Sequence, residues 1–560
     1  MSVQRPEAAS GHGQTLARSG VTPLQAVSLI LSLPLFLPLA AILFLAVTAD
    51  GGGWPDLIKT VLPSMLKQTF FLAGGVAALT LVVGAVMAWL VTFYSFPGRN
   101  LMKWSAILPL AVPGYITAFA YVDYFSYSGP FQTGVRKLMG WQTPAESWLP
   151  DIRSLGGAIF VLAFSLYPYV YMSARAAFMR QPMSQLDVAR TLGRTPWQAF
   201  LQIVLPQARP ALAVGASLVI MEVMNDIGAV QFFGVNTLTY GIYSTWLGQG
   251  DLGTAAQLAF VLLSGIAVLI GFEQVMRSRD TLSRGARAHS PIQRSRLRGA
   301  RAGAAFLALF IPIALGFLVP VLLLLHYGWR RLADLPSAAF FSAMMNSFLL
   351  AVLACAGTLF LALLFGHAMR DSEQNWLSRI TRFASFGYAL PGTVLAIGII
   401  IPFGFLDARI NALTQALFGY MPGLVLSGSL VALAFAYVTR FLVISTGTVN
   451  AGFEKISPHL DQVARTLGRK PFTVFREIHL PLLRPSLVTA MLLVFVDALK
   501  ELPATLLLRP FDFDTLATHV FTSASLGQLE EAALPALSIA AAGLIPVFIL
   551  SRNLRDAASN

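Results

Sequence analysis

The sequence predicts an all-α polytopic membrane protein of about twelve transmembrane helices, arranged as two tandem six-span halves. Of its 560 residues, 56% are hydrophobic and only 12% are charged, and the mean hydropathy is +0.68. A soluble domain carries about 25% charged residues, so this chain has too few to cover a water-exposed surface. Many of its apolar runs are long enough to cross a hydrocarbon core of about 30 Å as a helix, and a helix satisfies its own backbone in lipid.

An internal repeat divides the chain into halves. Residues 189–210 read ARTLGRTPWQAFLQIVLPQARP, and residues 464–485 read ARTLGRKPFTVFREIHLPLLRP. The starts of the two copies, 189 and 464, are 275 residues apart, about half of the chain. Repetition at a fixed offset indicates a repeated structural unit. Both copies are polar segments between apolar stretches, so each is predicted to be a loop between two spans.

Twelve apolar runs are assigned as spans, six in each half, and a polar linker at 276–302 joins the halves. The spans are 24–48, 68–93, 105–126, 155–178, 210–232, 254–275, 303–326, 343–368, 384–406, 424–448, 485–508 and 533–551.

Basic residues divide the loops into two sets. The repeated loops and the linker, which holds eight arginines, are rich in Lys and Arg, whereas the loops on the other side of the predicted bundle hold few. Basic residues near span ends stay in the cytoplasm. We therefore expect a multi-pass protein of the bacterial cytoplasmic (inner) membrane with both repeated loops and both termini cytoplasmic. The same bias explains the net charge of +13 without nucleic-acid binding.

Each repeated loop is predicted to form a short helix, a glycine turn and a second short helix. In the first copy Gly193 turns the chain, Thr195 caps the second helix and Pro196 fits its first turn. The second copy uses Gly468 in the same way, but Lys470 is a poorer cap. One interpretation is an amphipathic element that only braces the bundle. Its occurrence at equivalent places in both halves favours a pair of matched docking elements for a pair of cytoplasmic partners.

These loops resemble the EAA loops of permease subunits of ATP-binding-cassette (ABC) importers. That signature has an acidic-Ala-Ala start, a glycine after three more residues, and Ile-x-Leu-Pro after nine more. Departures are a valine at the second position of each copy, and Gln462 in place of the acid, with Asp461 one residue earlier. The matching positions are Asp187, Ala189, Gly193, Ile203, Leu205 and Pro206, and then Gln462, Ala464, Gly468, Ile478, Leu480 and Pro481.

The resemblance implies a type I ABC permease in a fused two-half form. It implies coupling helices that dock on two copies of a cytoplasmic ABC ATPase, a periplasmic or extracellular substrate-binding protein, and contact with membrane lipid. ATP and Mg would bind on the ATPase, and no cofactor is expected in this chain. The chain has no Gly-Lys dipeptide and hence no Walker A loop, so we expect a transport subunit rather than an enzyme.

The expected organisation follows from the spans and the resemblance. It is a cytoplasmic tail at 1–23, the first span and outer loop at 24–64, a first permease domain at 65–275, the basic linker at 276–302, the seventh span and outer loop at 303–339, a second permease domain at 340–551 and a C-terminal tail at 552–560.

A narrower resemblance concerns the cargo. Segments 222–243 and 500–518 look like the fifth-span exit of ferric-iron permeases, and importers of thiamine, phosphonates and polyamines share parts of them. Ferric iron is the first expectation and these solutes are the alternatives. A secondary transporter of major-facilitator type is more distant, because that fold lacks a long docking loop. A polytopic enzyme is also possible in principle, but no HExxH motif or nucleophile–base set stands out.

Charged residues recur at equivalent positions inside the fifth and eleventh spans. Glu222 and Asp226 correspond to Asp497 and Glu501, and Lys500 lies beside the second pair. Charges within the membrane are costly and usually face the bundle interior or water. The functional interpretation is that the four acids flank a translocation path. The alternative is a structural network with Lys500 and backbone groups.

Other features have plainer interpretations. The pairs Pro113-Gly114 and Pro391-Gly392 are either gate elements or kinks, and kinks are the commoner role. Tyr121, Asp123, Tyr124 and Tyr127 are typical of an interfacial cluster near an outer end. Cys355 is expected to be a small buried hydrophobe. The scattered histidines, His367, His459, His479 and His519, lack ligand spacing, so no metal site is expected.

Overall fold

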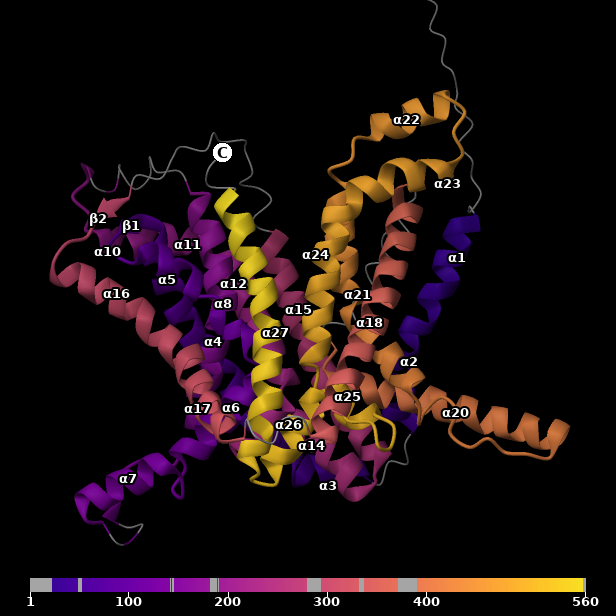
Figure 1. Cartoon of the computed structure of the whole chain (residues 1–560), viewed down its shortest axis with the longest axis horizontal. Helices are drawn as coiled ribbons and strands as arrows, with labels where there is room; N and C mark the ends of the chain where they lie inside the picture. The colour runs from indigo at the N-terminus through magenta and orange to yellow at the C-terminus, as the bar shows by residue number, and fades with distance from the viewer. Residues whose placement is uncertain are drawn as a thin grey trace, which may run out of the picture.

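The computed structural model describes residues 23–48, 53–141, 143, 146–181, 189, 191–278, 294–331, 337–370 and 390–556. Within these ranges ten helices are long and apolar enough to cross a membrane, and two bent helix pairs bring the number to twelve if each pair counts as one span. The prediction of an all-α polytopic protein is confirmed (Figure 1).

The first half begins with one span that combines α1, a 3-10 turn and α2. Its elements are α1 (Pro23–Ser32), η1 (Leu33–Phe36), α2 (Leu37–Thr48), α3 (Gly53–Lys59), α4 (Leu62–Phe93), β1 (Tyr94–Ser95), α5 (Arg99–Ser105), η2 (Leu108–Ala111), α6 (Gly114–Phe125), α7 (Pro130–Met139), α8 (Leu155–Met179), α10 (Pro196–Ala199), η4 (Phe200–Val204), α11 (Leu205–Gln207), α12 (Arg209–Asn225), α13 (Ile227–Phe232), α14 (Leu238–Tyr243), η5 (Ser244–Gly248) and α15 (Leu252–Ser278).

The second half repeats this order after the linker. Its elements are β2 (Ser295–Arg296), α16 (Ala300–Ile313), η7 (Ala314–Leu318), α17 (Val319–Arg330), α18 (Ala338–Arg370), α20 (Gly392–Phe418), α21 (Leu430–Phe453), α22 (Pro458–Thr466), α23 (Pro471–Val474), η10 (Phe475–His479), α24 (Leu480–Leu499), α25 (Pro503–Leu508), α26 (Leu516–Ser525) and α27 (Leu529–Asp556).

Glycines let the helices of the first half pack closely. A Cβ atom at Gly84 of α4 would lie 2.9 Å from the backbone nitrogen of Tyr171 in α8, and one at Gly215 of α12 would lie 2.9 Å from the Cα of Val170. Helices in a membrane associate through such small residues because lipid provides no hydrophobic drive between them. The helices α4, α8 and α12 thereby pack closely against one another.

The two halves exchange their first spans. Leu35 of the first span belongs to an apolar cluster with Leu361, Phe365 and Leu442 of the second half. In the other direction, Leu309 and neighbouring residues of α16 pack into the core of the first half. This exchange, which was not predicted from the sequence, makes each half depend on the other for part of its packing.

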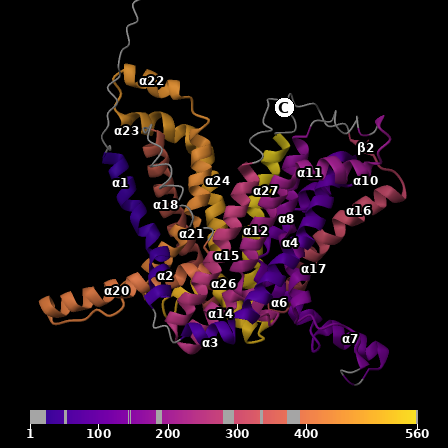
Figure 2. The ribbon, with the colours of Figure 1, turned by 180° about the vertical axis from the view of Figure 1, so that it is seen from behind.

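The repeated loops lie at one end of the bundle. Helices α22 and α23 of the second copy and α10 and α11 of the first lie at the same end, on the two sides of the molecule (Figures 1 and 2). The start of α1 and the end of α27 lie at this end too. A short parallel pairing of Tyr94 with Ser295 and of Ser95 with Arg296 joins the segment after α4 to the linker.

Candidate translocation site and coupling loops

The fifth and eleventh spans are broken at their acidic residues. Helix α12 ends at Asn225 and α13 begins at Ile227, while α24 ends at Leu499 and α25 begins at Pro503. Asp226 Oδ1 accepts a hydrogen bond of 2.8 Å from the backbone nitrogen of Ala229. The continuous spans expected at 210–232 and 485–508 are therefore corrected, because Asp226 caps α13 at the first break and Glu501 lies in the second break.

Glu501 makes a similar contact in the second half, one residue before Leu502, the N-cap of α25. Glu501 Oε1 accepts a hydrogen bond of 3.1 Å from the backbone nitrogen of Ala504, at the start of α25. Proline at position 503 has no N–H group and fits the first turn of a new helix. The two acids thus occupy the same place in the two halves, each satisfying a backbone donor that the broken span would otherwise leave free in the membrane.

The two Pro-Gly pairs pack directly against these acids. A Cβ atom at Gly114 would lie 2.6 Å from Asp226 Oδ2, and one at Gly392 would lie 2.8 Å from Glu501 Oε1. Both glycines open helices, α6 and α20, after a proline at the N-cap. The helices on either side of Pro113 are bent by 89°, so the kink is confirmed there, and the glycine adds close approach to an acid.

Contacts between the halves converge on Asn225. Its Oδ1 accepts a hydrogen bond of 2.8 Å from the backbone nitrogen of Gly392 and one of 3.1 Å from Arg440 Nη1. Arg440 Nε also forms an ion pair of 3.1 Å with Glu501 Oε2, and both side chains are less than a tenth exposed. We call Asn225, Gly392, Arg440 and Glu501 the cross-half latch.

A cavity of about 90 Å³ lies at this junction. Two further pairs complete its polar lining: Tyr169 donates to Glu222 Oε1 at 3.1 Å, and Lys500 Nζ lies 2.8 Å from Asp497 Oδ1. Residues of both halves form its wall, including all five predicted charged residues, Glu222, Asp226, Asp497, Lys500 and Glu501. The structure therefore brings the predicted set together and joins it to a polar network, so the two interpretations of these residues are compatible. Their role in transport stays a prediction.

The glycine turns of the repeated loops have the expected geometry. Gly193 and Gly468 have φ of 73° and 71°, in the left-handed region that favours glycine. The backbone nitrogen of Arg194 donates to the carbonyl of Ala189, and that of Arg469 donates to the carbonyl of Ala464, each at 3.0 Å. Both alanines are buried. Asp187 lies outside the described residues.

The second helices of the loops also follow the expected plan. Thr195 and Gln198 form a reciprocal capping box at the start of α10, whereas Lys470 makes no side-chain cap for α23. The chain then passes through a π-helical turn, η4 or η10, before the span. At the Ile-x-Leu-Pro positions of the signature, Pro481 is exposed, and the other five residues are partly buried, namely Ile203, Leu205, Pro206, Ile478 and Leu480.

The two loops are fixed to the bundle by different chemistry. In the first half the ring of Trp89 lies 5.6 Å from that of Trp197 and 4.8 Å from that of Phe200, measured between centroids. In the second half His367 occupies the place next to Phe475, at 4.9 Å. The first loop is therefore held by an aromatic cluster, and the second has polar groups in the same region.

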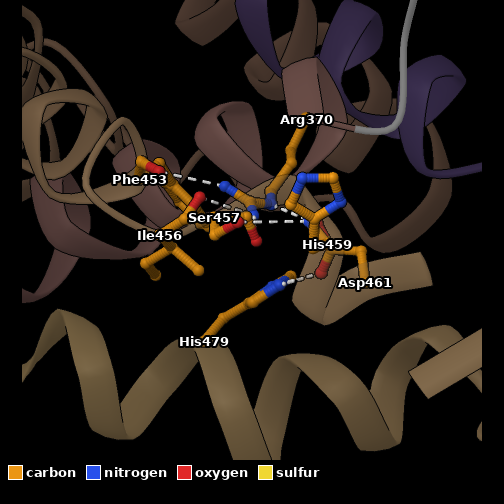
Figure 3. Close-up of polar contacts among 7 residues, drawn as sticks. All are labelled: Arg370, Phe453, Ile456, Ser457, His459, Asp461 and His479. Atoms are coloured by element: carbon orange, nitrogen blue, oxygen red, sulfur yellow. Dashed lines mark hydrogen bonds and ion pairs between the residues drawn. The ribbon is translucent and has the colours of Figure 1, made fainter. Parts of the chain in front are cut away.

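Asp461 organises the second loop (Figure 3). Its Oδ2 accepts a hydrogen bond of 2.7 Å from Arg370 Nε, and its Oδ1 lies 2.6 Å from His479 Nε2. Arg370 also donates to the carbonyls of Phe453 and Ile456, at 2.9 and 3.0 Å. Burial raises the pKa of Asp461, but hydrogen bonds from His479 and Arg370 outweigh it and leave that pKa below its usual range.

The acid of the second loop therefore faces the bundle. Gln462, at the signature position, is exposed and its Oε1 lies 3.2 Å from His459 Nδ1. Asp461, one residue earlier, joins α22 to the end of α18 and to η10. Among the described residues no group of three or more His, Cys, Asp or Glu side chains is arranged to hold a metal ion.

Comparison with known proteins decides the family. A family model described as the binding-protein-dependent transport system inner membrane component matches residues 80–279 and again residues 359–558. The two matches cover more than half of the chain, and each contains one repeated loop. The chain belongs to this family. It is the membrane-spanning permease subunit of a binding-protein-dependent ABC importer in an inner membrane, which replaces the secondary transporter and the membrane enzyme considered from the sequence.

One relative matches nearly the whole two-half chain, and two others match half of it or less. The chain is 27% identical over 533 residues to the Fe(3+)-transport system permease protein FbpB 2 of Haemophilus influenzae, covering 94% of this chain and 97% of that protein. It is 28% identical over 263 residues to the sulfate transport system permease protein CysT of Escherichia coli, covering 46% and 91%. It is 29% identical over 199 residues to the putative 2-aminoethylphosphonate transport system permease protein PhnU of Salmonella typhimurium, covering 35% and 67%.

The permease also contains site residues that were not predicted from its sequence. Arg440 lies within the predicted tenth span, where a charged residue is a functional candidate by default, so it could have been identified from the sequence. Asn225 carries no charge and Arg370 ends a span, so neither stands out. His479 was set aside with the other histidines because they lack ligand spacing, and its partner, Asp461, lies 18 residues away in the chain.

Proposed function

We propose that this permease moves ferric iron into the cytoplasm. The observation that carries the proposal is similarity along nearly the whole chain to a two-half permease whose name specifies Fe(3+). The cavity supports it, because four carboxyl groups and two basic groups line its wall. An excess of acids suits a cation better than sulfate or a phosphonate. Iron would pass along these acids without a resident site.

The energy would come from ATP bound with Mg on two copies of a separate cytoplasmic ATPase. The two exposed loop tips, at Leu192 and Leu467, offer one docking element to each copy. A substrate-binding protein would deliver the cargo at the opposite face. Both termini and both loops would then be cytoplasmic, in keeping with the position of α1, α22 and the end of α27 at one end of the bundle.

The cross-half latch supports a mechanism of alternating access. Asn225 of the first half is joined to Gly392 and Arg440 of the second at the wall of the cavity. Movement of the loops towards or away from each other would displace α12 against α20 and α21, because each loop continues into the span that carries an acid. Opening a path between the halves would therefore break the bonds of Asn225.

Transport in proteoliposomes tests the cargo. The permease with its ATPase would be reconstituted with ATP and Mg inside the vesicles and with the binding protein and radioactive ferric iron outside. We expect iron accumulation that stops when a non-hydrolysable ATP analogue replaces ATP. Parallel assays with thiamine, a polyamine and 2-aminoethylphosphonate measure the alternatives. ATP-driven uptake of one of these, with no uptake of iron, would overturn the assignment of cargo and leave the permease assignment intact.

A further inference from the structure

Two helical arms extend sideways from the bundle. Helix α7 projects from one flank and the far part of α20 from the other, and both lie near the end of the molecule opposite to α22 and α10 (Figures 1 and 2). They occupy equivalent places in the two halves, since α6 and α20 both begin at a Pro-Gly pair. The arms are therefore the outer continuations of two helices whose first residues pack against Asp226 and Glu501.

The arm on α20 is a fixed hairpin. Asp407, which is 1% exposed, accepts hydrogen bonds of 3.1, 2.8 and 2.8 Å from the backbone nitrogens of Val425, Leu426 and Ser427. Further out, Asn411 donates to the carbonyl of Gly423 and accepts from its nitrogen, both at 2.9 Å. The returning segment is thereby bonded to the helix without using any apolar side chain, so the exposed apolar surface is held in place.

That surface is large and nearly uncharged. Between residues 404 and 428 the only charged residues are Asp407, which is buried, and Arg409, which is exposed. The guanidinium of Arg409 lies 4.9 Å from the ring centroid of Phe405. The large hydrophobic side chains that are more than half exposed in this segment are Phe405, Leu413, Leu417, Phe418, Tyr420, Met421 and Leu424. A soluble surface rarely exposes such a contiguous apolar patch.

The arm on α7 has the same character with more charge. Leu138 and Met139 are 87% and 60% exposed, while Arg136 places its guanidinium 3.9 Å from the ring centroid of Tyr127. Gln132 is buried and donates to the carbonyl of Phe125 at 3.0 Å, which fixes α7 to the end of α6. Apolar and basic residues on one short helix, with aromatic rings beside it, are typical of the membrane interface.

We propose that both arms lie in the outer lipid–water interface and anchor the outer ends of α6 and α20 to the headgroup layer. Their opposite directions favour lipid over the binding protein, because the binding protein would deliver cargo at the junction of the halves, whereas lipid surrounds the bundle on every side. Lipid also forms a planar layer, as two arms at one level require. Arg136 and Arg409 would reach the phosphate groups while the apolar side chains enter the acyl region.

Depth-dependent quenching in vesicles tests this placement. With Cys355 replaced by alanine, Leu138→Cys and Phe418→Cys would each carry an NBD fluorophore in the full-length permease. The matched control is Phe511→Cys, because Phe511 is 96% exposed in the loop between α25 and α26. We expect nitroxide lipids labelled near the headgroup to quench both arm positions strongly and iodide to quench them weakly, with the reverse order at position 511.

The binding protein provides the deciding comparison. Adding it with cargo should leave the quenching of both arm labels unchanged. The proposal is overturned if iodide quenches position 138 or 418 as strongly as position 511. It is overturned in favour of a protein-docking surface if the binding protein then protects those positions from iodide.

Discussion

Arg440 in the second half and Asn225 in the first are joined by a hydrogen bond of 3.1 Å at the wall of the central cavity. The equivalent of Arg440 in the first half is Ser165, which lines the same cavity. The junction between the halves is thus asymmetric although the fold is repeated. One arginine serves both Asn225 and Glu501, so its removal should affect the contact between halves and the acid together.

Replacing Arg440 by alanine should destabilise the permease, because Glu501 would remain buried without a counter-charge. Removing one partner of a buried ion pair typically costs about 3–5 kcal/mol. We expect a lower unfolding temperature in detergent and higher ATPase activity of the assembled transporter without binding protein, since the cross-half latch is lost. Ser165→Ala is the matched control and should change neither quantity. An Arg440→Ala protein with unaltered stability and basal ATPase activity would contradict this role.

Asp226 allows its capping role to be separated from its charge. Asparagine caps helices about as well as aspartate, whereas alanine costs about 0.5–2 kcal/mol. Asp226→Asn should therefore retain the stability of the wild type but reduce iron uptake, while Asp226→Ala should lower both. Uptake and unfolding would be measured on the same preparations. Unchanged uptake by Asp226→Asn would show that the carboxylate acts only as a cap.

Asp461 should stabilise the second loop in a pH-dependent way. Its pKa is lower in the folded protein than in the unfolded chain, so its contribution is complete above the unfolded value of about 3.9 and disappears as the pH falls through the folded value. Asp461→Asn should therefore lower the unfolding temperature at mildly acid pH, where the carboxyl group is still ionised. This difference should shrink in stronger acid, as scanning calorimetry would show. A difference that grew between mildly acid pH and stronger acid would have the wrong sign.

Because α10 has a side-chain cap and α23 has none, alanine substitution at the two capping positions should have unequal effects on stability. Thr195→Ala removes a side-chain acceptor from the start of α10 and should cost about 1 kcal/mol. Lys470→Ala should cost almost nothing, because Lys470 makes no cap, and Lys470→Thr should stabilise the second loop. Hydrogen exchange of the two loop segments measures each effect locally. Equal protection changes in Thr195→Ala and Lys470→Ala would show that the capping box has no energetic role.

Local chemistry in the sequence was sufficient for much of the architecture. The apolar runs predicted the spans, and the left-handed glycines and the contrast between Thr195 and Lys470 followed from turn and capping preferences. The breaks at Asp226 and Glu501 were not predicted, because a periodic apolar run does not show that a carboxylate is capping a backbone nitrogen. The exchange of first spans depends on packing between distant segments, such as Leu35 with Phe365, which composition does not encode.

The sequence was sufficient to predict which charged residues line the candidate site, but not the residues with which they form hydrogen bonds and ion pairs. The repeat placed the four acids in equivalent positions, and the structure brings all four to one cavity. Arg440, the partner of Glu501, comes from another helix, α21, and its hydrogen bond to Asn225 crosses between the halves. The same holds for Asp461, whose partners Arg370 and His479 belong to two spans that approach each other only in the folded bundle.

Crosslinking tests most directly whether the two matched loops dock on two copies of the ATPase. Leu192 and Leu467 are equivalent, and they are 75% and 74% exposed at the tips of the loops. In a chain with Cys355 replaced by alanine, Leu192→Cys and Leu467→Cys would be combined and crosslinked to the assembled ATPase. We expect each single variant to capture one ATPase copy and the double variant to capture two. A double variant that captures only one copy, or none, would show that the two loops are not a pair of docking elements for two ATPase copies.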